Sequence, residues 1–212
     1  MHPYLRDTEY AAQNLIRLAM DEALHLDALS KELSRAEERV KLHQWDFQTS
    51  DLSEDFSDAY VMAAFGRAAR SAQEADQLRR EVVALQASIG SHQQATQAIA
   101  GAILQIAKQG LSLVFGGMAG VPKGRKIGSL HITDIIMQGR NQSLHHEERA
   151  FRQPVVEVFR VLELEQGERF SLSKHPGQNR ARQVAELLGW TSYAAYAQDM
   201  EMLLGPPPNL TA

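Results

Sequence analysis

The stretch Thr8–Lys41 constrains the fold of this chain most, because it contains neither proline nor glycine. Its apolar residues recur at steps of three and four with charged residues between them, which is the period of one helix face. These apolar positions are Leu15, Leu18, Leu26, Leu29, Leu33, Ala36 and Val40. The pattern predicts one long amphipathic helix.

A turn and a second long helix are predicted next. Thr49–Asp55 is rich in residues that cap helix N-termini, and acids suit the positive end of the helix dipole. An apolar stripe follows, ending at Gly90-Ser91, where glycine suits a C-cap and serine a new N-cap. This stripe is Val61, Phe65, Ala68, Ala72, Ala75, Leu78, Val82, Leu85 and Ile89. A third helix is then expected to run to about Phe115.

The second half of the chain contains further helical stretches. We expect a fourth helix from Leu130 to about Phe151 and a shorter one from Pro154 to Gly167, where the β-branched content leaves a strand open. A last helix is expected from about Gln178 to Leu204, split near Gly189 and capped by Thr191 or Ser192. The sequence therefore predicts an all-α protein, an antiparallel helical bundle with a long N-terminal arm. The expected parts are an arm at 1–48, a bundle at 49–204 and a disordered tail at 205–212.

Composition narrows the classes of function. The 212 residues include no cysteine, which excludes disulfides, thiol nucleophiles and cysteine-ligated metal centres. The net charge of −4 argues against a surface tuned throughout for nucleic acid, while leaving room for a local basic groove. The first residues lack a basic, then apolar, signal, and no window has the run of about 18 apolar residues that spans a bilayer. We expect a cytoplasmic protein with no membrane partner.

One short motif carries a recognisable chemistry. Arg140 is followed by Asn141, three spacers and His145. On a helix, positions five apart differ by about 140°, so Arg140 and His145 share a face only if the backbone bends or a second chain contributes. Gly139 lowers helix propensity at this point and makes a bend plausible. A similar pair, Arg169 and His175, lies in a polar loop without the asparagine.

The motif from Arg140 to His145 resembles that of HEPN domains. The resemblance covers this motif and the helical architecture. It implies a small antiparallel helical bundle that dimerises, with the two motifs of the dimer meeting in one cleft. Many HEPN proteins are metal-independent endoribonucleases of toxin–antitoxin, phage-defence and CRISPR effector systems. The resemblance thus implies a toxin or effector with an RNA substrate, a homodimer and a cognate antitoxin or other protein partner, and no cofactor.

The chemistry of such a site needs no metal, because RNA carries its own nucleophile in the 2′-hydroxyl. Applied to this chain, the resemblance makes His145 the general acid or base, since histidine titrates near neutrality. Arg140 would clamp the phosphate and stabilise charge on its oxygens, and Asn141 would position the phosphate or the arginine.

A basic loop precedes the motif. The stretch Gly116–Ser129 is rich in glycine and contains Lys123, Arg125 and Lys126, which makes it the most basic short segment. Its glycine spacing does not fit a P-loop. These three cations are candidate contacts for an RNA backbone.

Two other functions remain open. In the first, the long helices form a non-catalytic interaction or oligomerisation module, and Arg140 lies on a solvated face, paired with Glu147 or Glu148. In the second, the chain is a metal-dependent hydrolase, in which His145 and His146 would need a further ligand such as His131 or His43.

Overall fold

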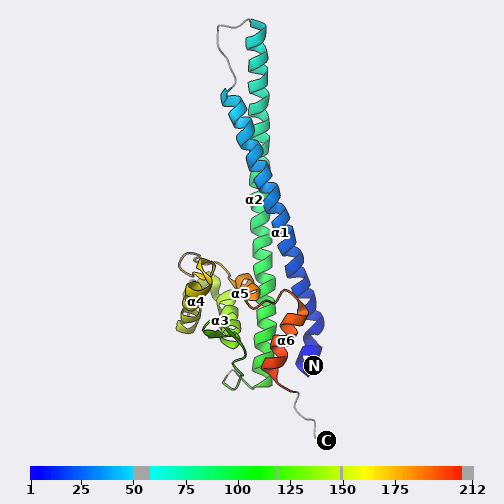
Figure 1. Ribbon diagram of the computed structural model, residues 1–212, viewed down its shortest axis with the longest axis vertical. Coiled ribbons are helices and arrows are strands. Elements are labelled where there is room, and N and C mark those ends of the chain that lie inside the picture. Colours follow the sequence, from blue (N-terminus) through cyan, green and yellow to red (C-terminus); the bar gives the residue numbers. More distant parts are fainter. Residues whose placement is uncertain (50–57, 118, 149, 207–212) are drawn as a thin grey trace. The chain divides into compact units, whose positions relative to one another are not determined.

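The computed structural model describes residues 1–49, 58–117, 119–148 and 150–206. Over these ranges it contains six α-helices and one two-stranded hairpin, so the predicted all-α class is confirmed (Figure 1). The elements are α1 (Pro3–Thr49), α2 (Asp58–Val114), β1 (Lys126–Ile127), β2 (Leu130–His131), α3 (Ile132–His145), α4 (Gln153–Gln166), α5 (Ala181–Leu187) and α6 (Tyr193–Leu204), with short 3-10 segments η1 (His146–Glu148) and η2 (Glu168–Phe170).

The chain forms two compact units. The first combines Met1–Glu22 with Gln94–Ala212, and the second is Ala23–Gln93, so both limits fall inside α1 and α2. The sequence-based boundaries at 48/49 and 204/205 stay predictions. The predicted turn after Thr49 and the predicted tail lie largely outside the described residues. None of the described helices has the length and apolar character needed to cross a membrane.

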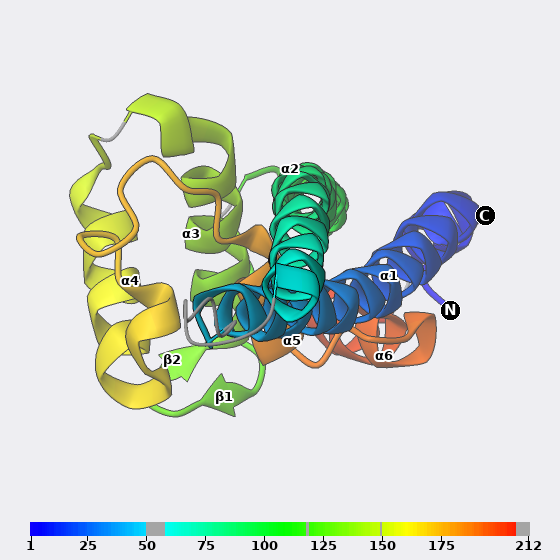
Figure 2. The ribbon, with the colours of Figure 1, turned by 90° about the horizontal axis from the view of Figure 1, so that it is seen from above.

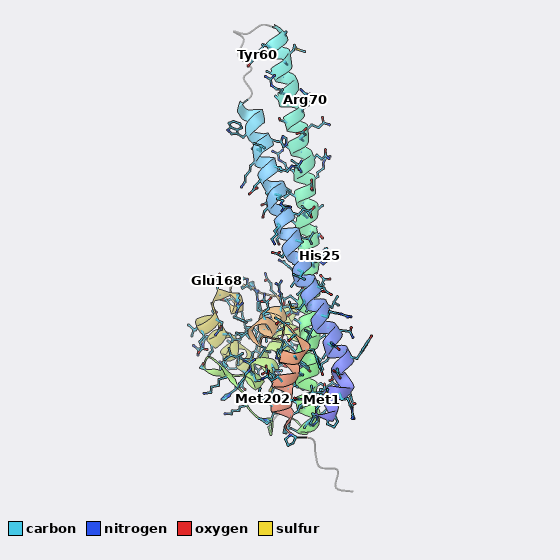
Figure 3. The ribbon with its side chains drawn as sticks, turned by 45° about the vertical axis from the view of Figure 1, so that its right-hand side comes forward. Met1, His25, Tyr60, Arg70, Glu168 and Met202 are labelled. Carbon is cyan, nitrogen blue, oxygen red and sulfur yellow. The ribbon has the colours of Figure 1, made fainter. Side chains whose placement is uncertain are left out.

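The second unit is an antiparallel pair of helical segments (Figure 3). The rings of His25 and His92 lie 4.6 Å apart, and Nδ1 of His43 lies 3.2 Å from Oε2 of Glu74. The two contacts are 18 residues apart on α1 (43 − 25) and 18 residues apart on α2 (92 − 74), in the opposite chain direction. The two helices are therefore antiparallel and keep the same register between these contacts. Small and aliphatic side chains fill the contact, which lets the helices approach closely: Leu26, Ala36, Ala64, Ala68, Ala75 and Leu78.

The predicted helix end at Gly90-Ser91 is wrong, because α2 runs unbroken from Asp58 to Val114. One glycine costs a helix interior about 1 kcal/mol, which packing along a helix this long easily offsets. The Ser91 hydroxyl donates to the carbonyl of Ala87, four residues back, so serine here serves the helix interior. Phe65, placed on the buried stripe by its spacing, is exposed, since Ala64 and Ala68 occupy the packed face.

The second half of the chain contains its helices in the expected order, but the helix ends are shifted. The predicted fourth helix begins two residues late, at Ile132, because Leu130 and His131 form β2 and pair with β1 inside the predicted loop region. It ends early, at His145, and continues as η1. The segment after Pro154 is a helix rather than a strand, and Gly167 ends it. The last helix is split as expected, with Ser192 accepting from the backbone N–H of Ala195.

The first unit contains the main hydrophobic core. Parts of α1 and α2 pack with α3 to α6 around it, and α3 has neighbours in both α4 and α5 (Figure 2). The largest fully buried side chains are Leu5, Ile103, Leu104, Leu111, Ile132, Ile135, Ile136, Phe159, Leu162, Phe170, Leu188 and Tyr196. Because α3 lies within this core, one of its faces is fixed by apolar packing.

A charged network ties the basic loop to α6. Arg125 donates through Nε and Nη2 to the two carboxylate oxygens of Asp199, at 2.7 and 2.8 Å. Nη2 of Arg125 also donates to the carbonyl of Leu188, and Trp190 Nε1 donates to Asp199 Oδ2 at 2.9 Å. The Asp199 side chain is only 5% exposed, and its hydrogen bonds raise the pKa of Arg125. A buried carboxylate with three charge-assisted or neutral donors is well satisfied, so this network anchors the loop.

Removal of the Asp199 carboxylate will destabilise the fold. Asp199→Ala is expected to cost about 3 kcal/mol, since Trp190 loses its acceptor and Arg125, which stays partly solvated, loses its partner. The exposed Glu201 on the same helix is a matched control, for which alanine should cost under about 0.5 kcal/mol. Urea unfolding of both variants measures this, and equal midpoints for the two would contradict the anchoring role.

Candidate functional site

The spacers of the motif fix which way α3 faces. Gln142 and Ser143 are 1% and 8% exposed. Gln142 Nε2 donates to the carbonyl of Gln178 at 2.8 Å, and its Oε1 accepts from the backbone N–H of Arg180 at 2.8 Å. Ser143 Oγ accepts from Asn179 Nδ2 at 3.1 Å. The two spacers therefore hold the segment before α5 and leave the other residues of the motif on the remaining faces.

Arg140 is held by neutral groups. Its Nε donates to Oε1 of Gln105, on α2, at 2.6 Å, and its Nη1 donates to Oδ1 of Asn141 at 3.2 Å. Asn141 in turn donates through Nδ2 to Oε1 of Gln138 at 3.2 Å. In the described part of the chain no carboxylate contacts Arg140. The amides orient the guanidinium without neutralising it, which is an arrangement suited to an anionic ligand.

His145 lies at the last position of α3 with its side chain 51% exposed. Its Nδ1 is 2.6 Å from Oε1 of Glu148, in η1. A carboxylate only accepts hydrogen bonds, so Nδ1 of His145 is the donor in this contact and Nε2 is the ring nitrogen that Glu148 leaves free. Glu148 therefore contacts His145. The solvated-face alternative had paired Arg140 with Glu147 or Glu148, and neither contact is present among the described residues.

Arg140 and His145 lie on one continuous helix, so their directions differ by about 140°. The glycine before Arg140 has a packing role: a Cβ on Gly139 would lie 2.8 Å from Cγ1 of Val184, on α5. On the same side of the motif, a Cβ on Gly101 of α2 would lie 2.5 Å from Ser143 Oγ. These glycines allow close backbone approach, which seats α3 in its place. A composite site from two chains stays a prediction.

The basic loop divides into two kinds of residue. Lys123 and Lys126 are exposed, whereas the fork of Arg125 is occupied by Asp199. The loop is fastened to the start of α3, because the Thr133 hydroxyl donates to the carbonyl of Pro122 at 2.6 Å. Contacts of the loop to RNA stay predictions. Arg125 has a structural role, since its contact with Asp199 anchors the loop.

The metal alternative gains no support from the histidines around the motif. Among the described residues, no group of three or more histidine, aspartate or glutamate side chains is placed to hold a metal ion. His146 Nδ1 lies 2.8 Å from the carbonyl of Ser143, and His131 Nδ1 lies 3.2 Å from that of Gly124. Both rings thus have backbone partners close by.

The second arginine and histidine pair has a different setting. Arg169 lies over the ring of Phe170, with the guanidinium carbon 5.0 Å from the ring centre, in η2. The carbonyl of His175 accepts from the backbone N–H of Gln178 in a turn. No amide network like that around Arg140 involves this pair among the described residues, so it serves as an internal reference for the first.

Comparison with protein-family models, with curated proteins and with solved structures finds no match to this chain. The residues of the site therefore carry the functional inference. Two of its members, Gln105 and Gln138, were not among the residues singled out from the sequence. Gln138 precedes the motif by two residues, but Gln105 lies 35 residues upstream of Arg140, and no local pattern marks it.

Gly139→Ala is expected to destabilise the protein by about 1 to 3 kcal/mol, because the added methyl group meets Val184. The clash outweighs the gain in helix propensity, which is about 1 kcal/mol. Val184→Ala removes the opposing methyl groups, so the double variant should lose less stability than the two single losses added together. A double-mutant cycle measured by chemical denaturation tests this. Strict additivity would show that Gly139 does not pack against Val184 as described.

Proposed function

We propose that this protein is a HEPN-like, metal-independent endoribonuclease, with Arg140, Asn141 and His145 as its site. The observation that carries the proposal is the state of Arg140: its guanidinium is oriented by Gln105 and Asn141, and both acceptors are neutral. A cation held in place with its charge uncompensated is suited to a phosphate, whose oxygens accept a planar pair of N–H groups. The motif's resemblance to HEPN domains supplies the reaction class.

The reaction would be an intramolecular transfer of the phosphoryl group of RNA from the 5′-oxygen to the 2′-oxygen. A ring nitrogen of one His145 takes the proton of the 2′-hydroxyl, and the 2′-oxygen attacks the adjacent phosphorus. The bond from phosphorus to the 5′-oxygen breaks, and that oxygen receives a proton from the second His145 of a dimer. The products are a 2′,3′-cyclic phosphate and a 5′-hydroxyl end. Arg140 stabilises the charge that gathers on the phosphate oxygens.

Glu148 is the positioning residue in this scheme. Its contact with Nδ1 of His145 directs Nε2 to the substrate, as an orienting carboxylate does in other acid–base sites. Leu144, exposed between the motif residues, offers apolar area beside the site. Such area supports the approach of a second chain, which the composite site requires.

Cleavage of a labelled RNA pool in EDTA tests the proposal. Wild-type protein should release 2′,3′-cyclic phosphate ends, and Arg140→Ala and His145→Ala should each lower the rate by about 100-fold or more. Glu148→Gln should lower kcat about tenfold with KM little changed, because it alters only the orientation of the ring.

Arg169→Ala is the matched control, since this arginine belongs to the second motif and should leave cleavage unchanged. Circular dichroism confirms that each variant is folded. An absence of cleavage by wild-type protein on varied RNAs, or equal loss in the Arg169 variant, would contradict the proposal.

One observation favours the non-catalytic interaction module as a second candidate. The second unit exposes several large apolar side chains, with Phe65 at 62% and Val83 at 65%. Single exposed apolar residues are ordinary, but several on a helical pair suit contact with other helices. Others in the same unit are Leu24, Leu42 and Met62.

The two candidates differ in which unit controls self-association. If the interaction module is correct, Phe65→Asp combined with Val83→Asp should abolish association in sedimentation velocity. The endoribonuclease proposal places the dimer contact beside α3, so there the same double variant should sediment like wild type and Leu144→Asp should dissociate. A wild-type monomer at micromolar concentration would contradict the composite site.

A further inference from the structure

Arg180 is a buried arginine whose charge is not paired. It precedes α5 and is only 5% exposed. Its Nη2 donates to Oε1 of Gln178 at 2.9 Å, and its Nε donates to no acceptor among the described residues. Burial lowers the pKa of Arg180. A guanidinium removed from water with a single neutral acceptor is costly, and such a group is normally paired.

Arg125 shows how this chain satisfies an arginine. The Nε and Nη2 groups of a guanidinium lie on one edge, and in Arg125 that edge donates to both oxygens of Asp199. In Arg180 the same edge meets one amide oxygen, so half of it is unused. The unused half of the edge suits a second oxygen of an anion that presents two acceptor oxygens.

Other donors near Arg180 already have partners. The backbone N–H of Ala181 donates to Asn179 Oδ1, and that of Arg182 donates to Gln97 Oε1, both at 2.8 Å. The guanidinium edge thus remains the donor set available to a ligand. The one acceptor on this edge comes from Gln178, an exposed residue whose side chain can move away without disturbing the core.

Arg180 lies beside the same helix as the candidate site. Its backbone N–H donates to Gln142, which is two residues after Arg140 on α3, about 3 Å further along the helix axis and about 160° away around it. RNA carries a phosphate at every nucleotide, so a strand that reaches Arg140 brings further phosphates to the surroundings of α3. An arginine fork binds phosphate oxygens in pairs, which favours a phosphate as the two-oxygen group.

We propose that the Nε and Nη2 edge of Arg180 binds a phosphate group, with a phosphate oxygen replacing the Gln178 amide oxygen and a second oxygen accepting from Nε. This phosphate is one that flanks the scissile phosphate of RNA, an assignment that rests on the proposed function. Arg180 is then a binding residue that sets where the strand lies relative to His145.

Thermal unfolding with inorganic phosphate and pyrophosphate tests the phosphate site without any cleavage. Wild-type Tm should rise with either anion. Arg180→Met removes the unpaired charge at similar length, so its Tm without anion should equal or exceed that of wild type, and the anion-dependent rise should vanish. Arg180→Lys keeps the charge without the fork and should show a reduced rise.

Arg182→Met is the matched control, because Arg182 lies two residues away and is paired with Glu186. It should keep the full anion-dependent rise. The proposal is overturned if the Arg180→Met protein retains the rise, if its Tm falls well below that of wild type, or if acetate raises Tm as much as phosphate does.

Binding of an uncleavable RNA carrying 2′-deoxy substitutions tests the source of the phosphate. Arg180→Met should weaken RNA binding about tenfold. It should also reduce the slope of log K against log salt concentration by about one, which corresponds to the loss of one phosphate contact. Loss of the anion-dependent rise in Tm without any effect on RNA binding would overturn the RNA assignment while leaving the phosphate site standing. Failure of wild-type cleavage bears only on the proposed function, since neither measurement here requires it.

Discussion

The buried amide of Gln142 is the interaction on which the rest of the site depends. It donates to the carbonyl of Gln178 and accepts from the N–H of Arg180, so both ends of one side chain are used in the core. A buried amide left unpaired is costly, and any rotation of α3 about its axis would break both bonds. The face of α3 that carries Arg140 is fixed as a result, and so is the segment that carries Arg180.

Three arginines in this unit show three uses of the same side chain. Arg125 donates through its Nε and Nη2 edge to both oxygens of a buried carboxylate and anchors a loop. Arg140 is half-buried and oriented by amides, and Arg180 is buried with half of its fork unused. Pairing, and not the number of cations, decides which of them are free to meet an anion. Within an acidic chain, the proposed phosphate-binding capacity is therefore local.

The sequence predicted the helical class, the split at Gly189 and a cap at Thr191 or Ser192, of which the structure has Ser192, because these depend on local periodicity and turn residues. It misplaced a helix end at Gly90, since a glycine signals a break only where packing does not carry the helix through. Gln105, Glu148 and Arg180 acquire their roles from contacts across 35, 3 and 38 residues. Only the second lies within reach of a local motif, and no spacing rule reveals the other two. Arg125 seemed from its basic neighbours to be an RNA contact, and only the tertiary structure places Asp199 against it.

The most direct measurement of the central claim is the perturbation of arginine Nε–H signals by an uncleavable RNA in heteronuclear magnetic resonance spectra. We expect the signals of Arg140 and Arg180 to move together on titration, because one strand supplies phosphates to both. The signal of Arg125 should stay in place, since Asp199 occupies its fork. Movement of the Arg125 signal with Arg140 and Arg180 unchanged would contradict the account.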